Sequence, residues 1–371
     1  MALRILATAD LHIGIPFTEY PPSLQADLAE ARFAALERLA ALGNERECRL
    51  LIVAGDLFHR VSLPQRDIQR AADALNAFHG EAVAVLPGNH DCYSGGSGSL
   101  WKSFRERAAD HVLLLVEPRP YELARYNLPV SLYPGPCTSK HSRANALGWL
   151  ASVKREKDAL AIGVAHGALE GVSPDMQGEY YLMSRAELES YGLDFWVLGH
   201  THRPPSDTDP RLFIPGTPEP DRFGFEQAGS ALLLEVEAGK VRADRVDTGT
   251  YRFRRETLEV EAEEPEAGFA RFFTPPSAGS TPERTLLRLA LRGSVDAEAM
   301  QRTRAQVDRL KQAVAWLEAD EAELRERITP AKVDAEFARG SFSWLLLHRL
   351  LETGAADALE LAYELIREVR G

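Results

Sequence analysis

The chain contains little cysteine and no long apolar run. Its 371 residues include three cysteines, Cys48, Cys92 and Cys137, which are odd in number and far apart. This spacing excludes a disulfide framework and a zinc site built from cysteines. No apolar run reaches the roughly 18 residues that a membrane-spanning helix needs, and the N-terminal apolar stretch is too short for a signal peptide. We therefore expect a cytoplasmic protein with no membrane association.

The sequence also lacks an excess of positive charge. Lys and Arg number 43 against 55 Asp and Glu, which gives a net charge of −12. That sign is wrong for binding nucleic acid through bulk charge, although a local basic or metal-charged cleft is compatible with it. At roughly 100–200 residues per domain, the length predicts two or three domains. With 45% hydrophobic and 26% charged residues, the composition is that of a globular chain.

The first 200 residues alternate between short apolar runs and amphipathic segments, which is typical of a layered α/β core. The apolar runs predict buried strands at residues 4–9, 50–54, 82–86, 112–116, 130–133, 159–165 and 195–198. The amphipathic segments predict helices at residues 24–42, 65–78 and 143–153. A capping box from Ser184 to Glu187 predicts a further helix before the last of these strands.

The sequence changes character after His202, where loops rich in Pro, Asp and Gly begin. Three antiparallel strands at 230–236, 240–246 and 251–260 are expected to close the first domain. The predicted parts of the chain are a first domain at 1–255, an acidic and Pro-rich linker at 256–282, a small β-α-β unit at 283–326 and a C-terminal helical segment at 327–371.

Six of the ten histidines lie in short groups that each follow a predicted strand. The groups are Asp10-Leu-His12, Gly55-Asp56-Leu-Phe-His59, Gly88-Asn89-His90-Asp91, His166-Gly167 and Gly199-His200-Thr-His202. Ligands gather beyond the carboxyl ends of the strands in an open α/β sheet, so five such loops can converge on one point. Residues two apart in an extended segment point to the same side. Asp10 with His12, and His200 with His202, can therefore each offer two ligands to one centre. Glycines before three of the groups are expected to permit sharp turns.

These groups contain two carboxylates, one amide oxygen and four or five imidazoles, with no thiolate. Such a mixture suits Mn, Fe or Zn better than a pure magnesium site. Seven or eight ligands are too many for one tetrahedral zinc, but they suit two ions about 3.5–4 Å apart that share a carboxylate. Taken singly, Asp56 has the alternative role of a helix or turn cap, His166 that of a core histidine and His59 that of a surface residue. Their occurrence together favours a metal site.

In this order the groups resemble the calcineurin-like metallophosphoesterase superfamily, over roughly residues 1–255. Residues 8–14, 55–59 and 214–220 are similar to the SbcD branch of DNA-repair exonucleases. The resemblance implies an α/β/β/α sandwich with a small cap domain, which the β-α-β unit would form. It implies that one ion is held by Asp10, His12, Asp56 and His202, and a second by Asp56, Asn89, His166 and His200.

The resemblance also implies the catalytic residues and the activity. His90 would be the catalytic histidine near the leaving group, and His59 matches an additional histidine of the nuclease branch. Asp91 either orients His90 or caps a turn. The implied activity is that of a Mn²⁺-dependent DNA exonuclease of DNA repair, which hydrolyses phosphodiester bonds through a metal-activated hydroxide. Mg²⁺, Fe²⁺ and Zn²⁺ are the alternative ions.

Two other functions stay open. A small-nucleotide phosphodiesterase or phosphatase would use the same ions, whereas a non-enzymatic scaffold would be expected to have lost ligands. Besides DNA, the expected partners are an SMC-like ATPase of the SbcC type and a second copy of this chain. The ATPase would dock on the apolar stripe of the last helix, which otherwise packs on its own domain; this stripe includes Leu359, Tyr363 and Ile366.

Overall fold

The computed structural model describes residues 2–95, 100–153, 159–173, 175, 177–205, 209–224, 227–274 and 281–370. The chain forms two compact units, Met1–Arg252 and Phe253–Gly371. Among the described residues, no helix is long and apolar enough to cross a membrane.

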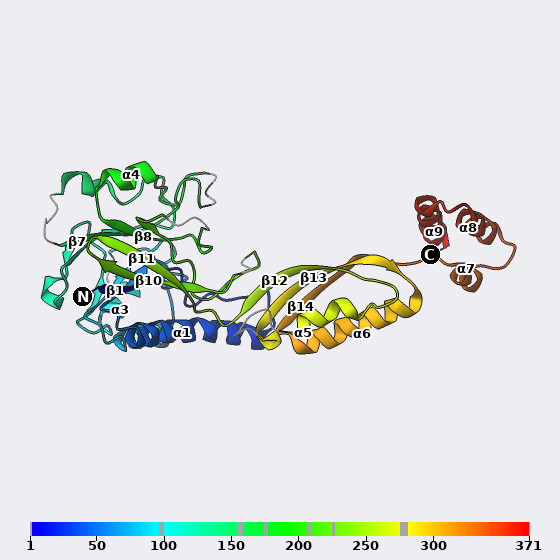
Figure 1. Ribbon diagram of the computed structural model, residues 1–371, viewed down its shortest axis with the longest axis horizontal. Helices are drawn as coiled ribbons and strands as arrows, with labels where there is room; N and C mark the ends of the chain where they lie inside the picture. Colours follow the sequence, from blue (N-terminus) through cyan, green and yellow to red (C-terminus); the bar gives the residue numbers. More distant parts are fainter. Residues whose placement is uncertain are drawn as a thin grey trace. The chain divides into compact units, whose positions relative to one another are not determined.

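The first unit is built on two sheets (Figure 1). In spatial order, the six-stranded sheet contains β11 (Lys240–Asp247), β10 (Ser230–Glu237), β1 (Leu3–Thr8), β2 (Leu50–Ala54), β3 (Ala82–Leu86) and β4 (Val112–Leu114). The five-stranded sheet contains β5 (Tyr121–Glu122), β6 (Val130–Gly135), β7 (Leu160–His166), β8 (Phe195–Gly199) and β9 (Leu212–Phe213). Strands β1 to β4 are parallel to one another, and so are β6 to β9.

Helices cover the outer face of the six-stranded sheet. They are α1 (Pro22–Glu45), α2 (Gln65–Asn76) and α3 (Leu100–Arg105). Leu36 of α1 and Leu75 of α2 belong to one buried cluster with Leu51 and Val53 of β2. The intervening residue Ile52 points into a second cluster, which fills the space between the two sheets. Strand β2 is therefore buried on both faces, as its continuous apolar run predicts.

The outer face of the five-stranded sheet is covered by α4 (Arg185–Ser190) and a short 3₁₀ helix, η2 (Gly148–Ser152). Leu188 of α4 packs there in a cluster with Tyr133 and Trp196. The layers of the first unit are thus helix, sheet, sheet and helix, and the predicted α/β/β/α sandwich is confirmed. The Ser184 side chain caps α4 by accepting a hydrogen bond from Glu187 N, as the capping box predicts.

The helix predicted at 143–153 does not form, because only η2 is helical within it. Side chains at its start bind nearby backbone groups instead. Ser142 Oγ donates to Ala144 O at 2.6 Å, and Asn145 Oδ1 accepts from Leu147 N at 3.1 Å. Such local hydrogen bonds compete with those of a helix, and they leave room for only the short 3₁₀ turn.

The second unit contains a three-stranded sheet in the order β12 (Arg252–Glu259), β13 (Thr285–Val295) and β14 (Trp316–Glu326). Helix α6 (Ala297–Ala313) joins the parallel strands β13 and β14, so the predicted β-α-β unit is present. Asp296 caps the N-terminus of α6, and its side chain accepts a hydrogen bond from Ala299 N. One face of the sheet packs against α6, with Leu289, Leu310 and Leu324 in the core.

The predicted division of the chain differs from the observed one. Strand β12 belongs to the second unit and does not close the first, which ends at Arg252. Most of the predicted linker is also structured: η3 (Ala267–Phe269) and α5 (Ala270–Phe273) follow β12. Leu258, Phe269 and Phe272 are buried in the core of the second unit. The apolar side chains of this acidic segment therefore fold it onto the second unit, although its composition indicates a linker. Residues 275–280 of this predicted linker lie outside the described residues.

Three helices end the chain: α7 (Pro330–Glu336), α8 (Phe342–Thr353) and α9 (Ala356–Arg370). Helices α8 and α9 meet at Gly354, whose φ of 68° is the left-handed C-cap that glycine favours. Their shared core includes Val333, Leu347, Leu359 and Tyr363.

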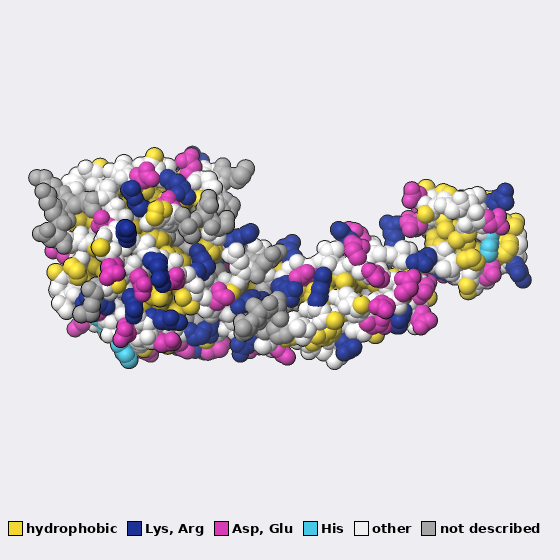
Figure 2. Space-filling model, viewed as in Figure 1, with side chains coloured by type: hydrophobic (Ala, Val, Ile, Leu, Met, Phe, Trp, Pro, Cys, Tyr) yellow, Lys and Arg dark blue, Asp and Glu magenta, His cyan; other side chains and the backbone are white. Residues whose placement is uncertain are grey.

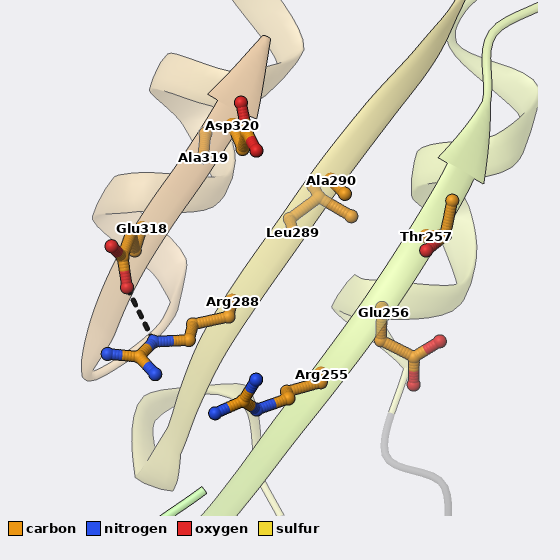
Figure 3. A pocket seen from close by; sticks show the side chains of 9 residues that line it. All are labelled: Arg255, Glu256, Thr257, Arg288, Leu289, Ala290, Glu318, Ala319 and Asp320. Carbon is orange, nitrogen blue, oxygen red and sulfur yellow. Dashed lines mark hydrogen bonds and ion pairs between the residues drawn. The ribbon is translucent and has the colours of Figure 1, made fainter. Parts of the chain in front are cut away.

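The face of the three-stranded sheet that α6 leaves open lines a shallow pocket (Figure 3). Its charged side chains come from all three strands, and Arg288 of β13 forms an ion pair with Glu318 of β14. No histidine lines this pocket. The described residues that form possible metal clusters all lie in the first unit, so the candidate metal site lies in that unit.

We expect Gly163→Ala to destabilise the first unit. A Cβ atom at residue 163 of β7 would lie 2.1 Å from Cε3 of Trp196, a side chain only 2% exposed. Overpacking of a close-packed core costs about 1–3 kcal/mol, which chemical denaturation measures. Gly148→Ala is the control because a Cβ there meets no atom within 4 Å. Equal stability of the two variants would contradict this packing.

Candidate metal centre

The five histidine groups lie at the carboxyl ends of β1, β2, β3, β7 and β8. Backbone hydrogen bonds join the first two groups: Asp10 N donates to Gly55 O at 3.1 Å, and His12 N to Asp56 O at 2.9 Å. The two sheets are joined by His166, whose Nδ1 lies 2.9 Å from Ala54 O. Parallel strands of both sheets end at this edge, and the predicted convergence of the loops is observed.

The residues expected to hold the first ion surround His12. Its Nε2 lies 2.9 Å from His202 Nε2 and 3.5 Å from Asp56 Oδ2. Asp10 Oδ1 lies 3.7 Å from His202 Nε2. Asp10, His12 and His202 each offer one ligand atom, and these atoms lie within 4.8 Å of one another.

The residues expected to hold the second ion meet at Asn89 and Asp56. Asn89 Oδ1 lies 3.1 Å from His166 Nε2 and 3.3 Å from His200 Nδ1. Asp56 Oδ2 lies 3.2 Å from His166 Nε2. The same oxygen of Asp56 therefore approaches ligands of both predicted groups, as a bridging carboxylate must. The assignment of each residue to one of two ions stays a prediction.

The backbone at this centre is strained. Asp10, His12, Asp56 and His200 have φ angles of 56°, 47°, 52° and 92°. A non-glycine residue in this region costs on the order of 1–3 kcal/mol, and such residues cluster at functional sites. Neither Asp10 with His12 nor His200 with His202 is an extended pair, so the alternation expected from sequence is not what brings these side chains together.

The glycines of the groups serve different purposes. Gly55 has a φ of +94° and makes the sharp turn that was expected. Gly88 and Gly199 are required for space instead. A Cβ at Gly88 would lie 2.4 Å from Asp56 N, and one at Gly199 would lie 1.9 Å from Ala54 O. Both close contacts are with the end of β2 and the residues after it, at the point where the loops are packed most tightly.

Two carboxylates at this centre are completely removed from solvent. Asp10 is 0% and Asp56 1% exposed. Burial raises the pKa of Asp10. For Asp56, burial opposes ionisation, but His166 and His12 beside it lower its pKa overall. Burial lowers the pKa of His12 well below its usual value and, together with His166, lowers that of His200 to about 3. Buried carboxylates beside imidazoles and an amide oxygen fit divalent cations, which would balance the buried charge.

His59 and His90 lie beside this cluster. His90 N donates to Asp56 Oδ1 at 2.9 Å, and His90 Nδ1 lies 3.1 Å from His59 O. The His59 and His90 rings are 5.0 Å apart, and each lies near the ring of His12, at 5.4 and 4.8 Å. Burial, with His90 nearby, lowers the pKa of His59 to about 4, so its ring is neutral at pH 7.

Asp91 was expected either to orient His90 or to cap a turn, and its contacts are those of a loop anchor. Its Oδ2 accepts from Phe58 N at 2.9 Å and its Oδ1 from Gly88 N at 2.6 Å. Trp101 Nε1 donates to its backbone carbonyl. The carboxylate thus ties the loop after β2 to the loop after β3. His90 is oriented by the carbonyl of His59 instead.

Sequence reasoning missed side chains that contact the predicted ligands, among them Asp221 and Tyr180. Asp221 Oδ2 lies 3.0 Å from His202 Nδ1, and the ring of Tyr180 lies 5.2 Å from that of His200. Asp221 directly follows the segment 214–220, whose similarity to the SbcD branch was the one available signal. Tyr180 lies in a loop with no apolar period and no neighbouring histidine group, so nothing in the sequence indicated it.

Metal binding should release protons. Burial on its own would lower the pKa of His166, but the neighbouring Asp56 carboxylate more than offsets this and raises the pKa to about 9. Below pH 9 this ligand therefore carries a proton that an incoming ion must displace. Apparent Mn²⁺ affinity should rise with pH between 6 and 8, by about tenfold per unit for each displaced proton, and level off above pH 9. Titration calorimetry in two buffers of different ionisation enthalpy counts these protons. An affinity independent of pH would refute the expectation.

Known proteins resemble this chain over most of its length. It is 24% identical over 355 residues to an uncharacterized metallophosphoesterase, YhaO, of Bacillus subtilis strain 168, and the match covers 90% of this chain and 82% of that protein. Among solved structures, TT1561 of Thermus thermophilus has 14% identity and a TM-score of 0.42, over 66% of this chain and 99% of that one. The purple acid phosphatase PPD1 of yellow lupin has 11% identity and a TM-score of 0.35, over 67% of this chain and 52% of that one.

The calcineurin-like phosphoesterase family matches residues 3–204, which is more than half of the chain. This segment contains all five histidine groups that converge at the candidate metal centre. The chain therefore belongs to the calcineurin-like phosphoesterase family, whose members are metal-dependent phosphoester hydrolases.

Proposed function

We propose that the chain is a Mn²⁺-dependent DNA exonuclease of DNA repair. This proposal rests mainly on the pair of His59 and His90 beside the predicted metal ligands. Both rings lie near that of His12, and the His59 carbonyl accepts the hydrogen bond that orients His90. A second histidine at this place matches the nuclease branch of the superfamily and distinguishes it from many other phosphoesterases.

Two bound divalent ions would supply a water nucleophile at neutral pH and offset the charge of the phosphoryl oxygens. The protein's part is to hold the ligands and to move a proton. His90 Nδ1 is hydrogen-bonded to the His59 carbonyl, so Nε2 is the nitrogen left to act on the substrate. In its protonated form it can donate from Nε2 to the departing 3′ oxygen. Neutral His59 can donate one hydrogen bond to a phosphate oxygen.

We expect His90→Ala to lower kcat by about 10²–10⁴-fold, because a positioned general acid contributes that much. Bound Mn²⁺ should stay at the wild-type amount, since no predicted ligand is removed. The assay uses end-labelled single- and double-stranded DNA and bis(p-nitrophenyl) phosphate, with Mn²⁺, Mg²⁺ or EDTA. His79→Ala is the control, because this exposed histidine lies just after α2, outside the histidine groups.

Hydrolysis of the small diester with DNA left intact would favour the small-nucleotide phosphodiesterase. Full activity of His90→Ala with both ions bound would refute the role of His90. Activity of the wild type in EDTA would refute a metal-dependent reaction altogether.

The stripe of α9 that was expected to dock the ATPase packs within its own helical segment, because Leu359 and Tyr363 are buried there and Ile366 packs against them. We further infer that an SMC-like ATPase of the SbcC type docks instead on the side chains that the last two helices leave exposed. Their exposed apolar side chains are Phe342, Leu345, Leu361, Leu365 and Val369. Figure 2 shows hydrophobic side chains gathered on this C-terminal part of the chain. Phe342 is 78% and Val369 89% exposed, and apolar side chains gathered on a surface mark interaction sites. An apolar helical segment of the ATPase would cover them.

The double variant Leu361→Asp, Leu365→Asp should lose this complex, because it places charges in the apolar contact. Both residues are exposed on α9, so the helix should still fold. Size-exclusion chromatography of the chain mixed with the ATPase measures the complex. Glu368→Ala on the same helix is the control. Retention of the complex by the Asp variant would place the contact elsewhere.

A further inference from the structure

The loop after β9 brings an acidic and a basic residue to the edge of the metal centre. Asp221 is buried, and its Oδ2 lies 3.0 Å from His202 Nδ1. Arg222 Nε donates to Asp221 Oδ1 at 3.2 Å. The Nη2 atom of Arg222 lies 3.4 Å from Asp221 Oδ2 and 3.2 Å from His202 Nδ1. One buried carboxylate therefore contacts both a predicted ligand and a guanidinium.

His202 separates this pair from the other ligands by the width of one imidazole ring. Its Nε2 lies 2.9 Å from His12 Nε2 and 3.7 Å from Asp10 Oδ1, whereas its Nδ1 faces Asp221. A carboxylate that accepts from the outer nitrogen of a metal-binding histidine fixes the orientation of that ring. Asp221 thus belongs to the support of the centre, and Arg222 lies just beyond it.

The Arg222 side chain reaches toward solvent from this anchored position. It is 62% exposed, whereas that of Asp221 is 4% exposed. An ion pair so exposed contributes little to stability, and Asp221 has His202 as a second partner. A guanidinium presents its N–H donors in a planar fork that matches two phosphate oxygens. An arginine anchored at this place is suited to recognising a phosphate.

We propose that Arg222 is a substrate-binding residue that donates hydrogen bonds to the non-bridging oxygens of the phosphoryl group at the metal centre. Asp221 is its positioning residue and holds the guanidinium against the ring of His202. The inference rests on the proposed phosphodiester hydrolysis, because it needs a phosphate bound among these ligands. It assigns substrate recognition to a residue of the loop after β9, beyond the five histidine groups.

The test compares Arg222→Ala and Arg222→Lys with wild type, by inorganic phosphate binding to the Mn²⁺-loaded protein and by kinetics on bis(p-nitrophenyl) phosphate. Arg222→Ala should weaken phosphate binding and lower kcat/KM by about 10- to 100-fold, the range for charge-assisted hydrogen bonds. Arg222→Lys should recover part of the loss, because it keeps the charge but not the fork. Mn²⁺ affinity should be the same in all three proteins.

Arg242→Ala is the matched control. Arg242 lies on β11, its side chain is 69% exposed, and it forms an ion pair with Asp244. Its loss should leave phosphate binding and kinetics at the wild-type values. Wild-type phosphate binding by Arg222→Ala would overturn the inference, and so would a loss of Mn²⁺ affinity that accounts for the weaker phosphate binding. Calorimetric phosphate binding needs no turnover, so it tests Arg222 even if the diester is not hydrolysed and the proposed function fails.

The positioning role of Asp221 is tested by a double-mutant cycle. If Asp221 acts on phosphate through Arg222, Asp221→Asn should weaken phosphate binding in the wild type but have little further effect in Arg222→Ala. The wild type, the two single variants and the double variant are all compared at saturating Mn²⁺, so that a change in metal affinity does not enter. Additive losses in the double variant would overturn this role, because they would show that the two residues act independently.

Discussion

The metal centre depends on the buried carboxylate of Asp56. One of its oxygens accepts the backbone N–H of His90, and the other lies within 3.5 Å of both His12 and His166. These contacts reach residues from strands of both sheets. A charge this deeply buried is costly unless cations balance it. The surrounding residues therefore have to form a rigid frame that can hold cations beside this carboxylate, and the loops are arranged to do so.

The frame consists of short backbone links between loops that are far apart in the sequence. Asp91 joins the loops after β2 and β3 through two backbone amides. His200 N binds both carboxylate oxygens of Asp10 at 3.1 Å. Links of this kind hold Asp10, His12, Asp56 and His200 in left-handed conformations that they would not otherwise keep. The buried strands of the two sheets anchor each loop at its start.

The sequence predicts the layered fold well because a strand buried on both faces leaves an unmistakable apolar run, as at 50–54 and 82–86. It also indicates which histidine groups converge, since each directly follows such a run. What it does not reveal depends on contacts between distant segments. Asp221 approaches His202 only through the fold of a loop that has no periodic apolar pattern. The local hydrogen bonds of Ser142 and Asn145 replace a helix that the amphipathic pattern indicates. Strand β12 was assigned to the wrong unit because alternation reveals a strand but not its neighbour.

The crowding around Gly88 and Gly199 has a consequence for protein design. Neither glycine offers a side chain to an ion, yet a methyl group at either would collide with the backbone at or just after the end of β2. Transplanting the seven predicted ligands onto another α/β sandwich should therefore also require glycine at these two positions. At this centre, the space that the two glycines leave is as necessary as the side chains that are predicted to bind the ions.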